Sequence, residues 1–309
     1  MDAASEHRRG VAAGVGAYSL WGLFPLVFHQ LGSVGAVEIL LHRIVWSFLV
    51  VVVVLRVAGD RGWFRRVRAT PGALPRLAAA AVLIATNWIV YIWAVNEERV
   101  TEAALGYYIN PLLTVALGTL VLGERLQRLQ RVALGFGGAA VVVLTVAYGR
   151  LPWISLVLAA SFAGYGYVKK QVPVGAAASL AVETLVLLVP ALVGMVVIQA
   201  GGDAAFGHGS TGRDALLLGL GVVTSVPLLL FAAAATRIPL SLVGLLQYLT
   251  PTLQLVCGVV VLGEDLPPER LAGFVLVWIA LGLLAYDALT RGRRATAATA
   301  AAVAASEAG

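Results

Sequence analysis

Ten long apolar runs, separated by short charged or Gly/Pro-containing segments, make up most of the 309-residue chain. Each run approaches the roughly 20 residues that a helix needs to cross a hydrocarbon core of about 30 Å. The expected fold class is therefore an all-α integral membrane protein, with little room for an aqueous domain. The predicted spans are residues 9–30, 36–56, 76–96, 101–122, 128–147, 151–168, 178–199, 214–235, 241–262 and 270–289.

Composition agrees with a lipid environment. Hydrophobic residues make up 60% of the chain and charged residues 12%, and the mean hydropathy is +0.90, far from the values of ordinary soluble domains. The single cysteine, Cys257, lies in an apolar run and has no partner for an internal disulfide. The four histidines are scattered along the sequence, so we expect no metal site.

The positive charge is distributed unevenly between the two sides of the predicted bundle. Of the 22 Lys and Arg residues, 17 fall in segments on the side of the N-terminus, four fall on the opposite side, and Arg43 lies within a span. An excess of Lys and Arg marks cytoplasmic segments, so both termini are expected in the cytoplasm and no nucleic-acid partner is expected. The Ala/Thr-rich residues 290–309 are predicted to form a disordered cytoplasmic tail.

The chain contains an internal repeat. A shift of 140 residues aligns residues 105–126 with 245–266, and 10 of these 22 positions are identical. Because the repeated unit holds five spans, an odd number, the second copy must cross the membrane in the opposite orientation. We therefore predict two inverted five-helix repeats, residues 9–147 (helices one to five) and 151–289 (helices six to ten), a plan that recurs in secondary transporters.

Polar and aromatic side chains within spans are the candidate lining of a central cavity, because polar groups that face lipid are costly. The fourth and ninth spans hold polar residues at spacing i, i+3 and i+7, which is one helix face, at the same register of the two repeats. Interhelical hydrogen bonding without a solute is the alternative for each. The candidates are Tyr18, Trp21, Asn87, Tyr91, Tyr107, Asn110, Thr114, Gln247, Thr250 and Gln254.

Charged groups within spans form a second candidate set, for coupling or for ion pairs: Glu38, His42, Arg43 and Glu183. Glu38 and His42 are spaced i, i+4 and can share a proton, and Glu183 occupies the position of Glu38 in the second repeat. The alternative for both glutamates is stabilisation by the dipole at a helix N-terminus. Glu102, in the first turn of its span, is assigned to the dipole.

The sequence Leu-Gly-Glu occurs once in each repeat, at residues 122–124 and 262–264. Glycine readily adopts the left-handed conformation that ends helices, so Gly123 and Gly263 are predicted helix stops. The glutamate that follows each glycine suits the start of the next helix. We expect structural turns here rather than catalytic sites.

Several function classes lack their required residues. An enzyme needs converging nucleophiles, acids or metal ligands, a P-loop ATPase needs its phosphate-binding loop, and a channel needs a selectivity filter; the sequence contains none of these patterns. The predicted function is a secondary transporter, an exporting permease for a small metabolite or drug-like solute, without a cofactor. The alternatives are a lipid-handling flippase or intramembrane enzyme, and a duplicated scaffold without transport.

Six motifs together resemble RarD-type proteins of the EamA family, in the drug/metabolite transporter superfamily, over residues 10–289: HRIVWS (42–47), NWIVYIWAVN (87–96), LGYYINPL (105–112), LGERL (122–126), LPW (151–153) and GLLQYLTPTLQ (244–254). The resemblance implies ten helices in two EamA repeats, both termini cytoplasmic, in the bacterial inner membrane. It implies a small-molecule substrate; the candidate coupling ion is the proton, because of the spacing of Glu38 and His42. It also implies a cavity lined by helices one, three, four, six, eight and nine, which adds Tyr165, and a peripheral helix two.

Overall fold

The computed structural model describes residues 3–122, 127–235, 237–238 and 240–307, and every regular element in these ranges is a helix. The predicted all-α fold is confirmed. Nine helical segments in the described ranges are long and apolar enough to cross a membrane. The tenth expected span is α8 (Trp153–Lys170), an 18-residue helix that carries two lysines in its last turn.

The helices follow the predicted order of five spans in each half. The α1–α2 pair forms the first span, and the segments α11, α12 and η1 form the ninth. A short additional helix, α4, follows the second span. In chain order the elements are α1 (Ala3–Gly22), α2 (Phe24–His29), α3 (Ala36–Val57), α4 (Trp63–Ala69), α5 (Ala73–Asn96), α6 (Val100–Leu122), α7 (Arg128–Tyr148), α8 (Trp153–Lys170), α9 (Ala176–Gly201), α10 (Thr211–Ala235), α11 (Leu240–Leu246), α12 (Leu249–Val256), the π-helical turn η1 (Cys257–Val261) and α13 (Pro268–Glu307).

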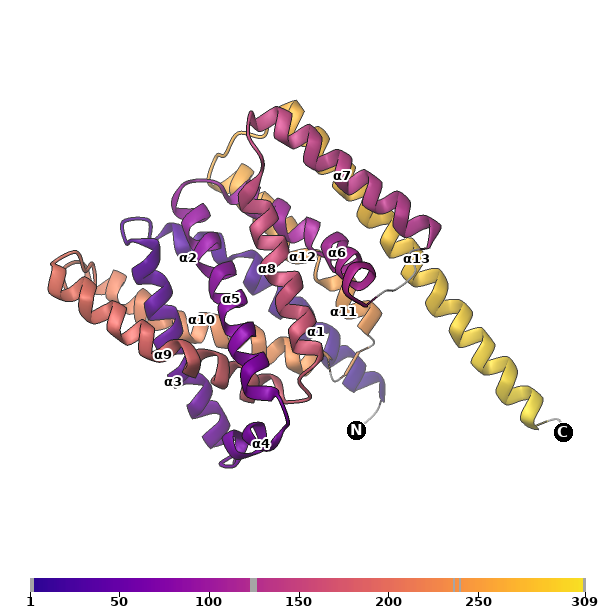
Figure 1. The fold of residues 1–309 in the computed structure, drawn as a ribbon, viewed down its shortest axis with the longest axis horizontal. Coiled ribbons are helices and arrows are strands. Elements are labelled where there is room, and N and C mark those ends of the chain that lie inside the picture. The colour runs from indigo at the N-terminus through magenta and orange to yellow at the C-terminus, as the bar shows by residue number, and fades with distance from the viewer. Residues whose placement is uncertain (1–2, 123–126, 236, 239, 308–309) are drawn as a thin grey trace.

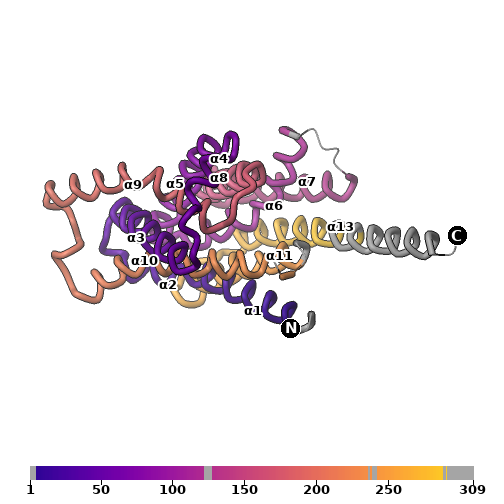
Figure 2. The backbone as a smooth tube through the Cα atoms, turned by 90° about the horizontal axis from the view of Figure 1, so that it is seen from below, coloured from indigo at the N-terminus to yellow at the C-terminus, as the bar shows by residue number. Residues whose placement is uncertain are grey.

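Helix packing reflects the internal repeat. Helix α1 packs against α10 and α12, and its counterpart α8 packs in the same way against α5 and α6. These two groups lie on opposite sides of the bundle (Figure 2). Other contacts join a helix to its own counterpart: α3 with α9, α6 with α12, and α7 with α13, the last pair standing at one edge of the molecule (Figure 1). The two halves are therefore related as inverted repeats.

The first and ninth spans are broken, and the break in the first has a clear cause. Pro25 has no N–H to donate to the carbonyl of Trp21, which lies four residues earlier. The N–H of Leu26 bonds to the carbonyl of Leu23, so it does not serve Gly22 either. The carbonyls of Trp21 and Gly22 thus lack helical partners, a situation that is tolerated within a membrane where other side chains supply hydrogen bonds.

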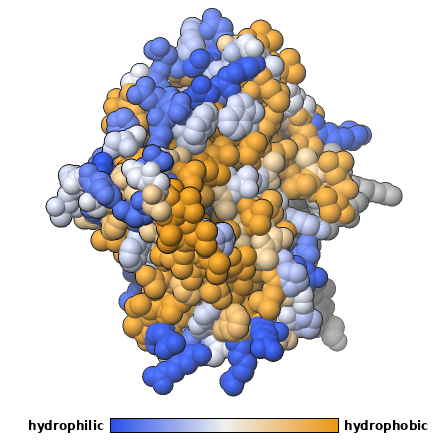
Figure 3. All heavy atoms as spheres, turned by 60° about the vertical axis from the view of Figure 1, so that its left-hand side comes forward, coloured by the Kyte–Doolittle hydropathy of each residue, from blue (hydrophilic) through white to orange (hydrophobic). Residues whose placement is uncertain are grey.

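The surface carries the apolar band that a membrane requires. Figure 3 shows apolar side chains across the middle of one face, with hydrophilic residues gathered above and below them. Exposed large hydrophobic residues occur on the spanning helices, for example Val146 on α7 and Val189 and Val196 on α9. Side chains of this kind are stable in contact with lipid tails, so this surface is suited to a bilayer.

The last helix is longer than the sequence predicts. A disordered tail was expected over residues 290–309, but the backbone of α13 continues as a helix to Glu307. Alanine, the most frequent residue in this segment, has the highest intrinsic helix propensity. Local propensity therefore favours a helix where apolar bulk for tertiary packing is missing.

Candidate functional site

Helix α12 binds the broken first span through two of its predicted polar residues. The hydroxyl of Thr250 donates to the backbone oxygen of Tyr18 at 2.9 Å. Nε2 of Gln254 donates to the carbonyl oxygen of Trp21 at 3.3 Å, one of the two carbonyls that the helix break leaves free. The same amide donates to the hydroxyl of Tyr91 at 3.2 Å. The stripe on the ninth span therefore connects α1 with α5.

The polar contacts continue from Tyr91 toward α8. The rings of Tyr91 and Tyr107 lie 5.8 Å apart, edge to face. The Tyr107 hydroxyl donates to Oδ1 of Asn87 at 2.9 Å, and Nδ2 of Asn87 donates to the carbonyl of Leu158 at 3.0 Å and to the hydroxyl of Ser161 at 3.2 Å. We call this set the central polar cluster: Asn87, Tyr91, Tyr107, Ser161, Thr250 and Gln254.

Arg43 lies beside this cluster, although the resemblance places helix two at the periphery. Its side chain is 4% exposed, and its guanidinium carbon lies 4.1 Å from the ring centroid of Trp88, 5.4 Å from that of Phe24 and 5.6 Å from that of Phe28. Its Nε donates to the Thr224 hydroxyl at 3.0 Å. Within the described ranges no carboxylate pairs with it. Helix α3 has exposed residues, such as Val53 and Val57, but Arg43 lies on its buried face.

The other two candidates on α3 have different surroundings. Both oxygens of Glu38 accept the N–H of Ala205 at 3.0 Å, and one also accepts the N–H of Phe206 at 2.9 Å. Nδ1 of His42 accepts the indole N–H of Trp46 at 3.0 Å, and its ring lies 4.8 Å from that of Phe206. Glu38 therefore anchors the loop between α9 and α10, and the described contacts include no hydrogen bond between Glu38 and His42.

Glu183, the repeat counterpart of the α3 glutamate, forms an ion pair. Nζ of Lys169 lies 2.6 Å from one of its oxygens, and this lysine also contacts the Ser179 hydroxyl. The Tyr165 hydroxyl donates to the other oxygen at 3.1 Å, and Ser179 donates to the first at 2.8 Å. Glu183 is 1% exposed. Tyr165, a predicted cavity residue, thus contacts this ion pair through its hydroxyl.

The remaining polar residues of the two predicted stripes lie outside the central polar cluster. Thr114 is exposed, and its hydroxyl donates to the backbone oxygen of Asn110 on its own helix at 3.0 Å. The side-chain oxygen of Asn110 is buried without a hydrogen-bond partner among the described residues. Gln247 is half-buried. Of the stripe on α6, only Tyr107 joins the cluster.

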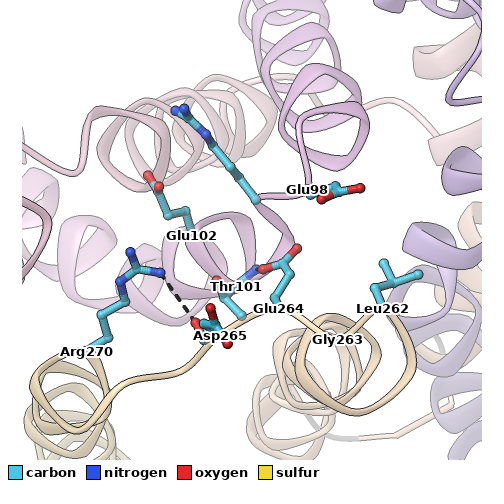
Figure 4. A pocket seen from close by; sticks show the side chains of 9 residues that line it. Glu98, Thr101, Glu102, Leu262, Gly263, Glu264, Asp265 and Arg270 are labelled. Atoms are coloured by element: carbon cyan, nitrogen blue, oxygen red, sulfur yellow. Dashed lines mark hydrogen bonds between the residues drawn. The ribbon is translucent and has the colours of Figure 1, made fainter.

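The Leu-Gly-Glu segment of the second repeat contacts the start of α6 at one end of the bundle (Figure 4). Gly263 has a φ of +73°, as the predicted helix stop requires. Glu264, however, accepts the N–H of Val100 and, at 2.8 Å, that of Thr101, so it caps a helix of the other repeat rather than the next helix in the chain. Burial raises the pKa of its carboxyl. The equivalent turn at 123–124 lies outside the described residues.

A polar pocket of about 260 Å³ adjoins this contact (Figure 4). Beside it, the Glu102 carboxylate, expected to interact with the helix dipole, also pairs with Arg150 at 2.6 Å. The described part of the chain contains no group of three His, Cys, Asp or Glu residues placed to hold a metal ion. The lining residues are Glu98, Arg99, Thr101, Glu102, Leu262, Gly263, Glu264, Asp265 and Arg270.

Sequence reasoning did not identify the surroundings of Arg43 as functional. Thr224, a polar residue in an apolar span, gave the one usable signal. Phe24, Phe28 and Trp88 gave none, because aromatic residues are common in spans and the rotation of each helix decides which of them faces a cation.

Comparisons with known proteins agree on one family. The EamA-like transporter family matches residues 8–146 and again residues 151–286. The chain is similar to Protein RarD of Streptomyces exfoliatus, with 50% identity over 297 residues, 96% of this chain and 94% of the relative. It is 44% identical to an uncharacterized transporter of Pseudomonas aeruginosa over 292 residues, 94% of this chain and 98% of the relative. A solved structure with 17% sequence identity has the same fold, with a TM-score of 0.57 over 89% of this chain and 96% of that chain.

Proposed function

The chain belongs to the EamA-like transporter family and is a membrane transporter, and from this premise we propose that it carries a small organic solute by alternating access between its two halves. The observation that carries the proposal is the position of the central polar cluster. Three of its residues bond to backbone carbonyls across the two halves: Thr250 and Gln254 reach the first half, and Asn87 reaches the second.

Bonds in these positions suit a site that opens and closes. A buried polar group that loses its partner costs free energy, so separation of the halves leaves groups that a polar solute can satisfy in turn. The rings of Tyr91, Tyr107 and Phe28, whose centroid lies 5.9 Å from that of Tyr91, supply apolar contacts for the carbon skeleton of an organic solute. The cluster therefore combines the two kinds of surface typical of small-molecule sites.

The proposal includes an orientation and a direction. The excess of Lys and Arg on the side of the N-terminus supports cytoplasmic termini in a bacterial inner membrane, and the direction we propose for transport is export. Protons are the candidate coupling ion, since Glu38 and His42 lie one helical turn apart within a span and the sequence has no P-loop for ATP. Alkaline phosphatase, which requires the periplasm, should be inactive when fused after Arg66; an active fusion would reverse the orientation.

Transport is tested with the purified full chain in liposomes. Labelled metabolites and antibiotics are screened for uptake with and without a proton gradient, and the transported solute is then followed in variants. Asn87→Leu and Gln254→Leu should each reduce the initial rate at least about tenfold, which corresponds to the loss of one or two buried hydrogen bonds. Thr114→Leu, outside the cluster, serves as the control and should retain the wild-type rate.

Two results would contradict the proposal. The first is an unchanged rate in both cluster variants at equal reconstitution. The second is the absence of uptake for every solute together with movement of a fluorescent phospholipid between leaflets, which would favour a lipid-handling protein.

A further inference from the structure

We propose that Arg43 is the anion-binding residue of this transporter and that the transported solute carries a carboxylate group. This inference rests on the proposed transport function, since it names the substrate class of the same site. It is tested by equilibrium binding, however, so that its failure can be separated from a failure of transport.

Among the described residues, Arg43 has neither a partner of opposite charge nor a bond to a backbone group, whereas Glu183, Glu102 and Glu38 each have one or the other. Glu183 pairs with Lys169, Glu102 pairs with Arg150, and Glu38 accepts backbone N–H groups. Arg43 is equally buried, yet its one described hydrogen bond is to a neutral hydroxyl. A buried charge without a counterion is strongly unfavourable, and in a membrane such residues mark substrate or ion pathways.

The free edge of the guanidinium has the geometry that a carboxylate requires. Thr224 occupies Nε, and no described residue accepts a hydrogen bond from Nη1 or Nη2. Those two nitrogens present parallel N–H groups that bind both oxygens of one carboxylate. The Trp88 ring below the guanidinium, with Phe24 and Phe28 beside it, fixes the plane of the group. An anion is therefore bound at the free edge of a pre-oriented fork.

The neighbouring groups favour an anion over a cation. The phenols of Tyr91 on α5 and Tyr107 on α6 lie close enough to interact with the charge of Arg43, and both belong to the central polar cluster. The Tyr91 hydroxyl accepts from Gln254, so its O–H can donate to a bound anion, and no described carboxylate competes for the guanidinium. A solute held by Arg43 would thus contact the cluster with its remaining polar groups.

The fold itself does not require a charge at this position. The shift of 145 residues that pairs Glu38 with Glu183 pairs Arg43 with Leu188, and Leu188 packs against a buried apolar cluster of α3 and α9. The equivalent positions of the two repeats therefore hold an arginine on α3 and a leucine on α9. The charge is specific to one half, as expected for a residue that serves the solute.

The binding test uses the purified full chain in detergent and three related probes: benzoate, its neutral analogue benzamide, and phenyl phosphate. Thermal unfolding is followed as each probe is titrated. Benzoate should raise the Tm in a saturable manner and benzamide should not; phenyl phosphate is included because an arginine fork also binds phosphate, and the proposed carboxylate preference requires it to bind less tightly than benzoate.

Variants of the arginine assign the effect to Arg43. Arg43→Gln should weaken benzoate binding at least about tenfold, and Arg43→Lys, which keeps the charge but not the fork, should fall between it and the wild type. Arg56→Gln, which removes an exposed charge from the end of the same helix, is the matched control and should bind as the wild type does. If Arg43→Gln does not fold, the test uses Arg43→Lys and Thr224→Val instead. Thr224→Val removes the hydroxyl that accepts the hydrogen bond from Arg43 Nε. Each of these variants should bind benzoate several-fold more weakly than the wild type.

Four outcomes would overturn the inference. These are a wild-type Tm that benzoate leaves unchanged, equal binding of benzoate and benzamide, unchanged benzoate affinity in the folded Arg43 variants, and tighter binding of phenyl phosphate than of benzoate. If benzoate binding depends on Arg43 but no solute is transported in liposomes, the anion site is supported and the transport function is contradicted. If a neutral solute is transported at a rate that Arg43→Lys does not change, the transport function is supported and the anion site is contradicted.

Discussion

Helices α6 and α12 occupy equivalent places in the two repeats, but they use the same polar register differently. On α12, Thr250 and Gln254 are buried and bind the backbone of α1. On α6, the equivalent Asn110 has an unpaired oxygen, and the equivalent Thr114 bonds within its own helix. The two stripes were predicted as one shared lining, and the structure brings mainly one of them to the central polar cluster.

The neighbouring helix explains the difference. Helix α12 faces the first span, where Pro25 leaves carbonyls without helical donors, whereas α6 faces α8, which is continuous over its whole length. Side-chain amides bind where backbone groups are free, which accounts for the bond of Gln254 to Trp21; the bond of Thr250 is to the Tyr18 carbonyl, which the break does not free. An unequal pair of halves is also what one conformation of an alternating-access carrier should contain.

The largest expected effect concerns the paired glutamates of the two repeats. Glu183→Gln should lower the free energy of unfolding by about 2 kcal/mol, because it leaves the buried end of Lys169 without a carboxylate; the lysine is 25% exposed, which keeps the cost below that of a fully buried pair. Glu38→Gln should cost about 1 kcal/mol, since an amide oxygen still accepts the loop N–H groups. Unfolding by SDS in mixed micelles measures both, and the opposite ranking would contradict the assigned roles.

A smaller difference is expected between the stripes themselves. Gln254→Leu should destabilise the protein by about 1.5 kcal/mol, because the Trp21 carbonyl and the Tyr91 hydroxyl lose a donor. Thr114→Val, at the equivalent register, should change the stability by less than about 0.5 kcal/mol. The same unfolding assay compares the two variants. Equal costs would show that the stripes are used alike.

Replacement of the proline sharpens this comparison. In a Pro25→Ala background, residue 25 has an N–H that can bond to the Trp21 carbonyl, so Gln254→Leu should cost less than it does with Pro25 present. A double-mutant cycle isolates this coupling, which should be about 1 kcal/mol. A coupling of zero would mean that the helix break is not the reason for the α12 contact.

The smallest expected effect is the pH dependence from Glu264. Burial raises its folded-state pKa above the ordinary value of 4.5, so the folded protein retains this proton over a pH range in which the unfolded chain has released it. The stability from this group is fully present below pH 4.5 and is lost as the pH rises through the raised pKa. Glu264→Gln should remove this slope from the free energy of unfolding. An identical pH profile in the variant would contradict the shift.

Much of the site could be predicted residue by residue, but not its connections. Asn87, Tyr91 and Gln254 were recognised as polar or aromatic groups within spans, and the structure brings them together. Periodicity assigns a residue to a helix face, but it does not fix the rotation of that face toward a particular neighbour. The contacts of Arg43 show this: the resemblance implied a peripheral helix two, and only the structure shows that this side chain points to the buried side of α3.

The sequence by itself determined the fold class, the ten spans and the inverted repeat, because hydropathy over about 20 residues and a duplicated segment are properties of the chain that need no knowledge of packing. Only the tertiary structure decided which copies of a repeated polar position are used. The reason is physical: a hydrogen bond or an ion pair requires two groups to meet within a few ångströms, and partners such as Gln254 and Trp21 are 233 residues apart in the sequence.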